Sequence, residues 1–142
     1  MKVQKFELFH GAVLTKLVRS DRPITLRMIE TRPSEAWSAY TLNNEVDLYI
    51  KYNTAPRSLK RDRAGTAWTF VFGQDELGQM RRSVSKRQTY AALVCGRCNI
   101  GKDSMQVCLL YPDEIQGIIY ADLRGAPGPH HQIRPEETPE GH

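Results

Sequence analysis

Two segments that alternate between apolar and polar residues flank an Asn-Asn pair, and this arrangement constrains the fold more than any other feature. The first segment covers residues 37–42 and the second covers residues 45–52. Alternation with a period of two is typical of strands, because successive strand side chains point to opposite faces of a sheet. Asn tolerates positive φ angles better than most residues, so Asn43 and Asn44 favour a tight turn. The sequence therefore predicts a β-hairpin.

Helical and strand-like patterns alternate along the rest of the chain. Residues 3–18, residues 75–83 and the segment that begins at Pro112 have the spacing or the start signals of helices. The other strand-like segments are residues 24–30, 67–72, 90–95 and 107–110. The last two are continuous apolar runs, which predicts that both strands are buried.

These patterns predict one domain of the α/β (α+β) class over residues 1–122. We expect a mainly antiparallel or mixed sheet of about six strands, flanked by three helices. Residues 123–142 are rich in proline, carry several acids and contain almost no large apolar residue. This composition predicts a disordered acidic tail.

The composition is that of a folded domain outside the membrane. The chain of 142 residues is long enough for one hydrophobic core and too short for two ordinary domains. No apolar run approaches the roughly 20 residues that cross a bilayer, and the first residues lack a hydrophobic signal region. We therefore expect a soluble, cytoplasmic protein that does not bind membranes.

The charge is unevenly distributed. The net charge is +4, but residues 121–142 contain two arginines and four acids, so the rest of the chain carries +6. A basic body is typical of proteins that bind nucleic acid or another polyanion. Small soluble domains also carry net charges of this size, so both interpretations stay open.

One face of the second hairpin strand carries the candidate catalytic residues Glu45, Asp47 and Lys51. Glu45 and Asp47 are about 6.6 Å apart along a strand and could share a Mg²⁺ ion. Glu30 from a neighbouring strand is a third candidate metal ligand. Lys51, about 13 Å from Asp47, would assist rather than bind the metal. The alternative is a polar sheet face that simply contacts solvent.

Two basic groups could neutralise phosphates. The first basic group comprises Arg57, Lys60, Arg61 and Arg63, and the second comprises Arg81, Arg82, Lys86 and Arg87. The candidate nucleic-acid-binding residues are the whole first group together with Arg81 and Arg82. Trp68, Tyr49 and Tyr52 lie nearby in the sequence and could stack on unpaired bases, although packing in the core explains strand aromatics equally well.

The cysteines offer a weak zinc signal. Cys95 and Cys98 have the spacing of half a zinc site, and Cys108 with a tail histidine, His130 or His131, could complete it. Because Cys108 lies within an apolar strand, we expect Cys95 and Cys108 to be buried core residues instead.

A histidine outside the tail could act as a catalytic base. His10 lies within the first predicted helix. It is expected to be a packed or capped surface residue, so Ser-His or Cys-His catalysis is not predicted.

The order of helix, strands, helix and strand, with acids and a lysine in the middle strands, distantly resembles the PD-(D/E)XK nuclease superfamily over roughly residues 3–95. In that family an acid near one strand and an acid-x-Lys on the next assemble a magnesium site, which activates water and stabilises phosphoryl charge. The resemblance implies that Asp47 matches the first acid. Tyr49 occupies the position two residues before Lys51, so the acid-x-Lys triplet is absent.

The leading prediction is a nucleic-acid-binding protein, a divergent or degenerate nuclease-like module that contacts phosphates through basic loops. One alternative is a non-enzymatic accessory subunit that forms a homodimer or binds an acidic partner. The other is an active Mg²⁺-dependent nuclease that uses Glu45 and Asp47, with Lys51 assisting.

Overall fold

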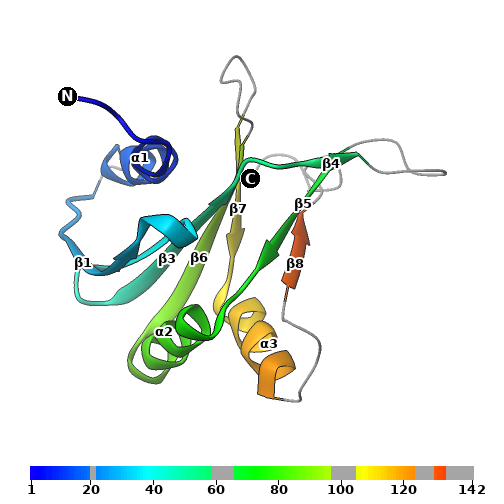
Figure 1. Ribbon diagram of the computed structural model, residues 1–142. Coiled ribbons are helices and arrows are strands. Elements are labelled where there is room, and N and C mark those ends of the chain that lie inside the picture. Colours follow the sequence, from blue (N-terminus) through cyan, green and yellow to red (C-terminus); the bar gives the residue numbers. More distant parts are fainter. Residues whose placement is uncertain (20–21, 59–65, 97–104, 124–129, 134–142) are drawn as a thin grey trace.

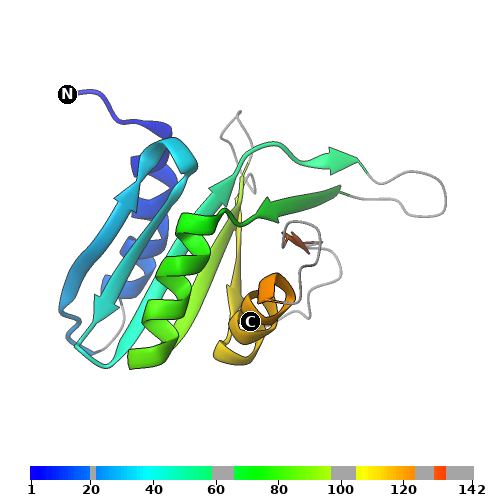
Figure 2. The same ribbon diagram turned by 60° about the horizontal axis from the view of Figure 1, so that its bottom comes forward.

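The computed structural model describes residues 1–19, 22–58, 66–96, 105–123 and 130–133. They form three layers, with helix α1 (Lys5–Val18) on one face of a five-stranded sheet and helices α2 (Gln74–Lys86) and α3 (Pro112–Leu123) on the other (Figures 1 and 2). The predicted fold class, a single α/β (α+β) domain with three helices, is confirmed. Among the helices of the described residues, none is long and apolar enough to cross a membrane.

The main sheet is mixed and has the order β1-β2-β3-β6-β7. Its strands are β1 (Leu26–Arg32), β2 (Trp37–Leu42), β3 (Val46–Asn53), β6 (Gln88–Cys95) and β7 (Gln106–Leu110). β1, β2 and β3 form the predicted antiparallel meander, with the short 3-10 helix η1 (Pro33–Glu35) between the first two. β6 is parallel to β3, and β7 is antiparallel to β6. The parallel pair requires a long crossover, which α2 supplies.

A smaller sheet contains β4 (Arg57–Ser58), β5 (Thr66–Val71) and β8 (His130–Ile133). β5 runs between the main sheet and β8, and it leads directly into α2 (Figure 1). The fourth predicted strand therefore lies outside the main sheet. β8 belongs to the segment that the sequence predicts to be a tail, and it pairs with β5.

The hairpin turn has the expected positive φ angles but is one residue longer than predicted, because Leu42 pairs with Val46 and Glu45 lies in the turn. Asn43 and Asn44 adopt φ angles of 52° and 57°, so both lie in the left-handed region that a type I′ turn requires. The Asn43 side chain also accepts a hydrogen bond of 2.7 Å from the backbone N–H of Thr25. This bond ties the turn to the residue that precedes β1.

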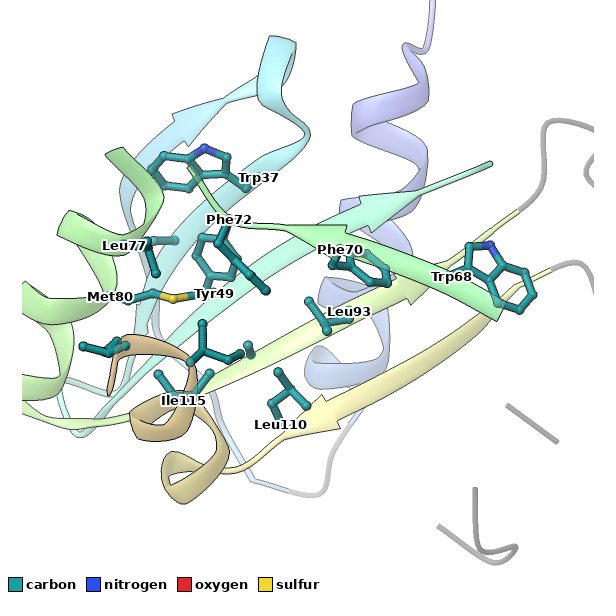
Figure 3. Packing of buried hydrophobic residues seen from close by; sticks show 14 of the residues in the cluster. Trp37, Tyr49, Trp68, Phe70, Phe72, Leu77, Met80, Leu93, Leu110 and Ile115 are labelled. Carbon is teal, nitrogen blue, oxygen red and sulfur yellow. The ribbon is translucent and has the colours of Figure 1, made fainter. Parts of the chain in front are cut away.

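Two apolar clusters fill the space on either side of the sheet. α1 covers one face, where Phe9 and Val13 pack against side chains of β2, β3 and β6. α2, α3 and β5 cover the other face, where Leu77 and Ile115 meet Tyr49, Leu93 and Leu110 (Figure 3). Each face of β3 is therefore covered by a helix.

β7 differs from the expectation of a buried strand. Val107 and Leu109 are 40% and 45% exposed, whereas Leu110 is fully buried. The apolar run in the sequence is continuous, but β7 is an edge strand and α1 does not cover its outer face. Only the side that faces α3 enters the core.

Candidate functional site

The polar face of β3 is buried, so the solvent-facing alternative is wrong. Asp47, Tyr49 and Lys51 alternate along the strand, and Asp47 and Lys51 are only 2% and 8% exposed. They lie under α2 rather than in water, because the crossover from β5 to β6 places that helix over this face. Glu45 precedes β3 and is exposed.

Lys51 belongs to a buried polar cluster with Glu76, in the first turn of α2. Lys51 Nζ lies 2.7 Å from both carboxylate oxygens of Glu76. The Tyr49 hydroxyl donates to the same carboxylate, and burial together with the charge of Glu76 raises the pKa of Tyr49 well above its usual value. Glu76 also accepts a hydrogen bond of 3.2 Å from the Gly73 N–H at the start of the helix. This cluster fixes α2 on the sheet.

Asp47 has different partners. Its carboxylate accepts hydrogen bonds of 2.9 Å from the Thr41 hydroxyl and 3.3 Å from the Arg87 guanidinium. Lys51, four residues along the strand, is held by Glu76. The structure therefore does not bring the predicted catalytic residues Glu45, Asp47 and Lys51 to one point.

The predicted metal ligands are also separated. Glu30 forms an ion pair of 3.3 Å with Arg32, while Asp47 is engaged by Thr41 and Arg87. Across the described parts of the chain, no three His, Cys, Asp or Glu side chains gather closely enough to hold a metal ion. Glu45, Asp47 and Glu30 are all described, and they do not form such a group.

A cationic pocket lies over Asp47 instead. Residues on neighbouring strands form one transverse row, because Arg27 pairs with Thr41, and Thr41 pairs with Asp47. The last turns of α2 lie over this row and border a pocket of about 130 Å³. Its cationic side chains are Arg27, Arg82, Lys86 and Arg87.

The charge of this pocket is largely uncompensated. Within the described residues, Arg87 is paired with Asp47, whereas no carboxylate pairs with Arg27, Arg82 or Lys86. All three are exposed at the rim. Four cations and one carboxylate give the pocket a formal charge of +3. An arrangement of this kind attracts anions, and arginine forks match the geometry of phosphate oxygens.

A second pocket of about 360 Å³ adjoins the first, and Lys86 and Arg87 line both. It lies between the end of α2 and the start of α3, and Pro112 and Gln116 of α3 line its far side. The two pockets form one continuous surface at the junction of α2 and β6.

The sequence identifies part of this surface. Arg82, Lys86 and Arg87 belong to the predicted second basic group, while Arg81 is half-buried and lines neither pocket. Arg27 was missed because it is a single arginine in a strand-like segment. It reaches the pocket only through the pairing of β1 with β2. Of the first basic group, Lys60, Arg61, Arg63 and the side chain of Arg57 lie outside the described residues.

The aromatic candidates are core residues. Trp68 is buried and donates a hydrogen bond of 2.9 Å to the Gly96 carbonyl, and Tyr49 is buried under α2. Tyr52 is half-buried and stacks on Phe9, with 5.2 Å between the ring centres. Of the two interpretations left open for these rings, the structure supports packing within the protein, since Trp68 and Tyr49 are buried and Tyr52 packs on Phe9.

The cysteines also belong to the core. Cys95 is buried in β6, Cys108 packs against the same cluster from β7, and both thiols are free. Burial raises the pKa of Cys95 to about 12. Cys98 lies outside the described residues, and His130 and His131 are described only as backbone of β8.

His10 is buried between α1 and the sheet. Its Nδ1 lies 2.5 Å from the Ser38 hydroxyl, and its Nε2 lies 3.4 Å from the Ala36 carbonyl. Ser38 is fully buried, so this pair has no access to a substrate. His10 is packed, but it is only 2% exposed, so the expectation of a surface residue is wrong.

Comparison with known protein families, with curated proteins and with solved structures finds no match.

Proposed function

We propose that this chain binds nucleic acid and that the cationic pocket formed by Arg27, Arg82, Lys86 and Arg87 is the main contact with phosphate. The observation that carries the proposal is the set of three rim cations, Arg27, Arg82 and Lys86, that no described carboxylate neutralises. Phosphate contacts of this kind supply most of the affinity of non-specific nucleic-acid binding.

The order of the elements is consistent with a divergent nuclease-like module. Helix α1, the antiparallel meander β1–β3, the strands β4 and β5, helix α2 and strand β6, which is parallel to β3, follow one another in the chain. The order of helix, strands, helix and strand is the layout on which the resemblance to the PD-(D/E)XK superfamily rests. The separation of Glu45, Asp47 and Glu30 favours binding over Mg²⁺-dependent cleavage.

Fluorescence-anisotropy titrations with short single- and double-stranded DNA and RNA, at several salt concentrations, test the proposal. The variant R27Q/R82Q/K86Q removes three pocket cations, and the variant K5Q/K16Q/R19Q removes three exposed cations from α1 and its C-terminal end, on the opposite side of the sheet. The pocket variant should lower the slope of log K against log salt by about 2 to 3, whereas the control should change it much less. Absence of binding by the unmodified protein at low salt would reject the proposal.

The first basic group can be tested separately. Replacement of Lys60, Arg61 and Arg63 by alanine should also flatten the salt dependence if these residues add phosphate contacts. An unchanged slope would confine binding to the pocket.

A protein-interaction subunit is the second candidate, and the edge strand β7 favours it. Val107, Leu109 and Tyr111 are exposed and follow one another at strand spacing. Size-exclusion chromatography with light scattering should find a dimer that Leu109→Lys dissociates. A monomer at high protein concentration would argue against this candidate.

A further inference from the structure

The two adjoining pockets differ in charge although they share Lys86 and Arg87. The smaller one is the cationic pocket described above, and it contains two additional cations, Arg27 and Arg82. The larger pocket contains no other charged residue, and its remaining lining includes Gln88 and Gln116. Positive charge is therefore concentrated at one end of the surface and decreases toward α3.

The smaller pocket has a polar floor that holds two of its arginines in place. Asp47, Gln79 and Ser83 are all buried. Arg87 donates to Asp47 at 3.3 Å, and Arg82 donates to Gln79 at 3.1 Å. These bonds fix both guanidinium groups before any ligand arrives, which lowers the entropic cost of binding a phosphate.

The high positive charge of the smaller pocket discriminates between two kinds of phosphate group. A phosphodiester within a nucleic-acid strand carries one negative charge. A terminal phosphomonoester carries about 1.5 to 2 negative charges at pH 7, because its second pKa is about 6. A pocket with a formal charge of +3 and a volume of about 130 Å³ favours the more highly charged group.

We propose that the smaller pocket binds the terminal phosphomonoester of a nucleic-acid strand and that the larger pocket holds the adjoining nucleotide. The inference rests on the proposed function and adds to it that the protein recognises strand ends. In the larger pocket, the exposed amides of Gln88 and Gln116 can donate and accept hydrogen bonds, and Pro112 supplies an apolar surface. Neutral partners of this kind suit a sugar and a base.

Three single-stranded oligonucleotides of one sequence, labelled at an internal base, test the inference. One carries a 5′-phosphate, one carries a 3′-phosphate, and one has hydroxyl groups at both ends. At pH 7.5 and low salt, one of the phosphorylated strands should bind at least about fivefold more tightly than the hydroxyl-ended strand, and the preferred end defines the polarity of the site. The preference should decrease at pH 5.5, where the monoester carries about one charge.

The affinity for the preferred phosphorylated strand, divided by the affinity for the hydroxyl-ended strand, separates end recognition from general phosphate binding. R27Q/R82Q/K86Q should reduce the preference to less than about twofold, whereas K5Q/K16Q/R19Q should preserve it. Equal binding of all three strands by the unmodified protein would overturn the inference and leave nucleic-acid binding intact. Failure to bind any of them would overturn both.

Discussion

Lys51 and Glu76 form a buried ion pair that joins the middle of the sheet to the first turn of α2. Both carboxylate oxygens lie 2.7 Å from Lys51 Nζ. Tyr49 donates its hydroxyl to the same carboxylate, so the pair also has a neutral partner. The centre of the Phe72 ring lies 5.6 Å from the ammonium group, which is within the range of a cation–π contact. A charge at this position is stable only while its partner remains.

Glu76→Gln should lower the free energy of unfolding by about 3 to 5 kcal/mol, because it leaves the Lys51 ammonium group buried without a counter-charge. Urea unfolding followed by circular dichroism measures this change. Asp75→Asn is the matched control, since Asp75 occupies the preceding position of α2 and forms an exposed ion pair of 3.4 Å with Arg32. That substitution should cost no more than about 1 kcal/mol.

The double variant K51M/E76L provides a second test of the pair. It removes both charges and keeps apolar volume at the two positions, so it should be more stable than Glu76→Gln alone. A double variant that is less stable than Glu76→Gln would show that packing, rather than the uncompensated charge, accounts for the loss.

The sequence predicts elements formed by local interactions and fails where distant segments meet. The hairpin follows from alternation and from Asn43 and Asn44, and the first helix follows from its helical periodicity. The burial of Lys51 depends on α2, which is separated from it by more than 20 residues, and on the crossover that makes β6 parallel to β3. Alternation identified two faces of β3 correctly, but it could not show that both are covered.

The turn between β2 and β3 gives a test at a single residue. Asn44 has a φ of 57°, and the side chain that accepts the hydrogen bond from Thr25 N–H belongs to Asn43. Asn44→Gly should be neutral or slightly stabilising, whereas Asn44→Ala should cost about 1 kcal/mol because alanine disfavours the left-handed region. Thermal unfolding of both variants measures the difference. Equal stability would show that the turn can adopt another geometry.

The cationic pocket illustrates the same limit of sequence reasoning. Arg82 and Arg87 were found because basic residues cluster around the end of α2. Arg27 reaches them from β1, and Asp47 reaches them from β3, through strand pairing that connects distant segments. Asp47 was identified as a candidate metal ligand, but in the structure it holds an arginine.

Gly96 lies where β3, β5, β6 and α1 converge, and a side chain there should be destabilising. Its N–H donates to the Asn53 carbonyl at 3.0 Å, and its carbonyl accepts from Trp68. A Cβ atom on Gly96 would overlap the ring of Phe9. Gly96→Ala should therefore lower the free energy of unfolding by about 1 to 3 kcal/mol.

A double-mutant cycle with Phe9→Leu separates this overlap from backbone effects. If the ring causes the strain, Phe9→Leu should cost less in the Gly96→Ala background than in the unmodified protein. Gly11→Ala is the control on the same helix as Phe9, because a Cβ there meets no atom within 4 Å. It should stabilise the protein by about 0.5 to 1 kcal/mol. Strict additivity in the cycle would exclude the contact as the cause.

His10 should make the folded state sensitive to mild acid. Burial lowers its pKa to about 4, although the carbonyl of Ala36 partly opposes this effect. In the unfolded chain the pKa of histidine is about 6.5. Between these values the unfolded state binds more protons than the folded state, so stability falls as the pH decreases from 6.5 toward 4. The expected loss from this residue is about 2 to 3 kcal/mol by pH 4.5.

His10→Gln removes the titrating group and provides the comparison. The variant should be less stable than the unmodified protein at pH 7.5, because it loses the ring that stacks on Phe6 with 4.0 Å between the ring centres. The difference in free energy of unfolding should shrink by about 2 to 3 kcal/mol between pH 7.5 and pH 4.5, since only the unmodified protein must keep a buried histidine neutral. Carboxyl groups titrate in both proteins and cancel in the comparison. Ser38→Ala keeps the histidine and should retain the steep pH dependence. Parallel stability curves for His10→Gln and the unmodified protein would mean that His10 can take up a proton without loss of the fold.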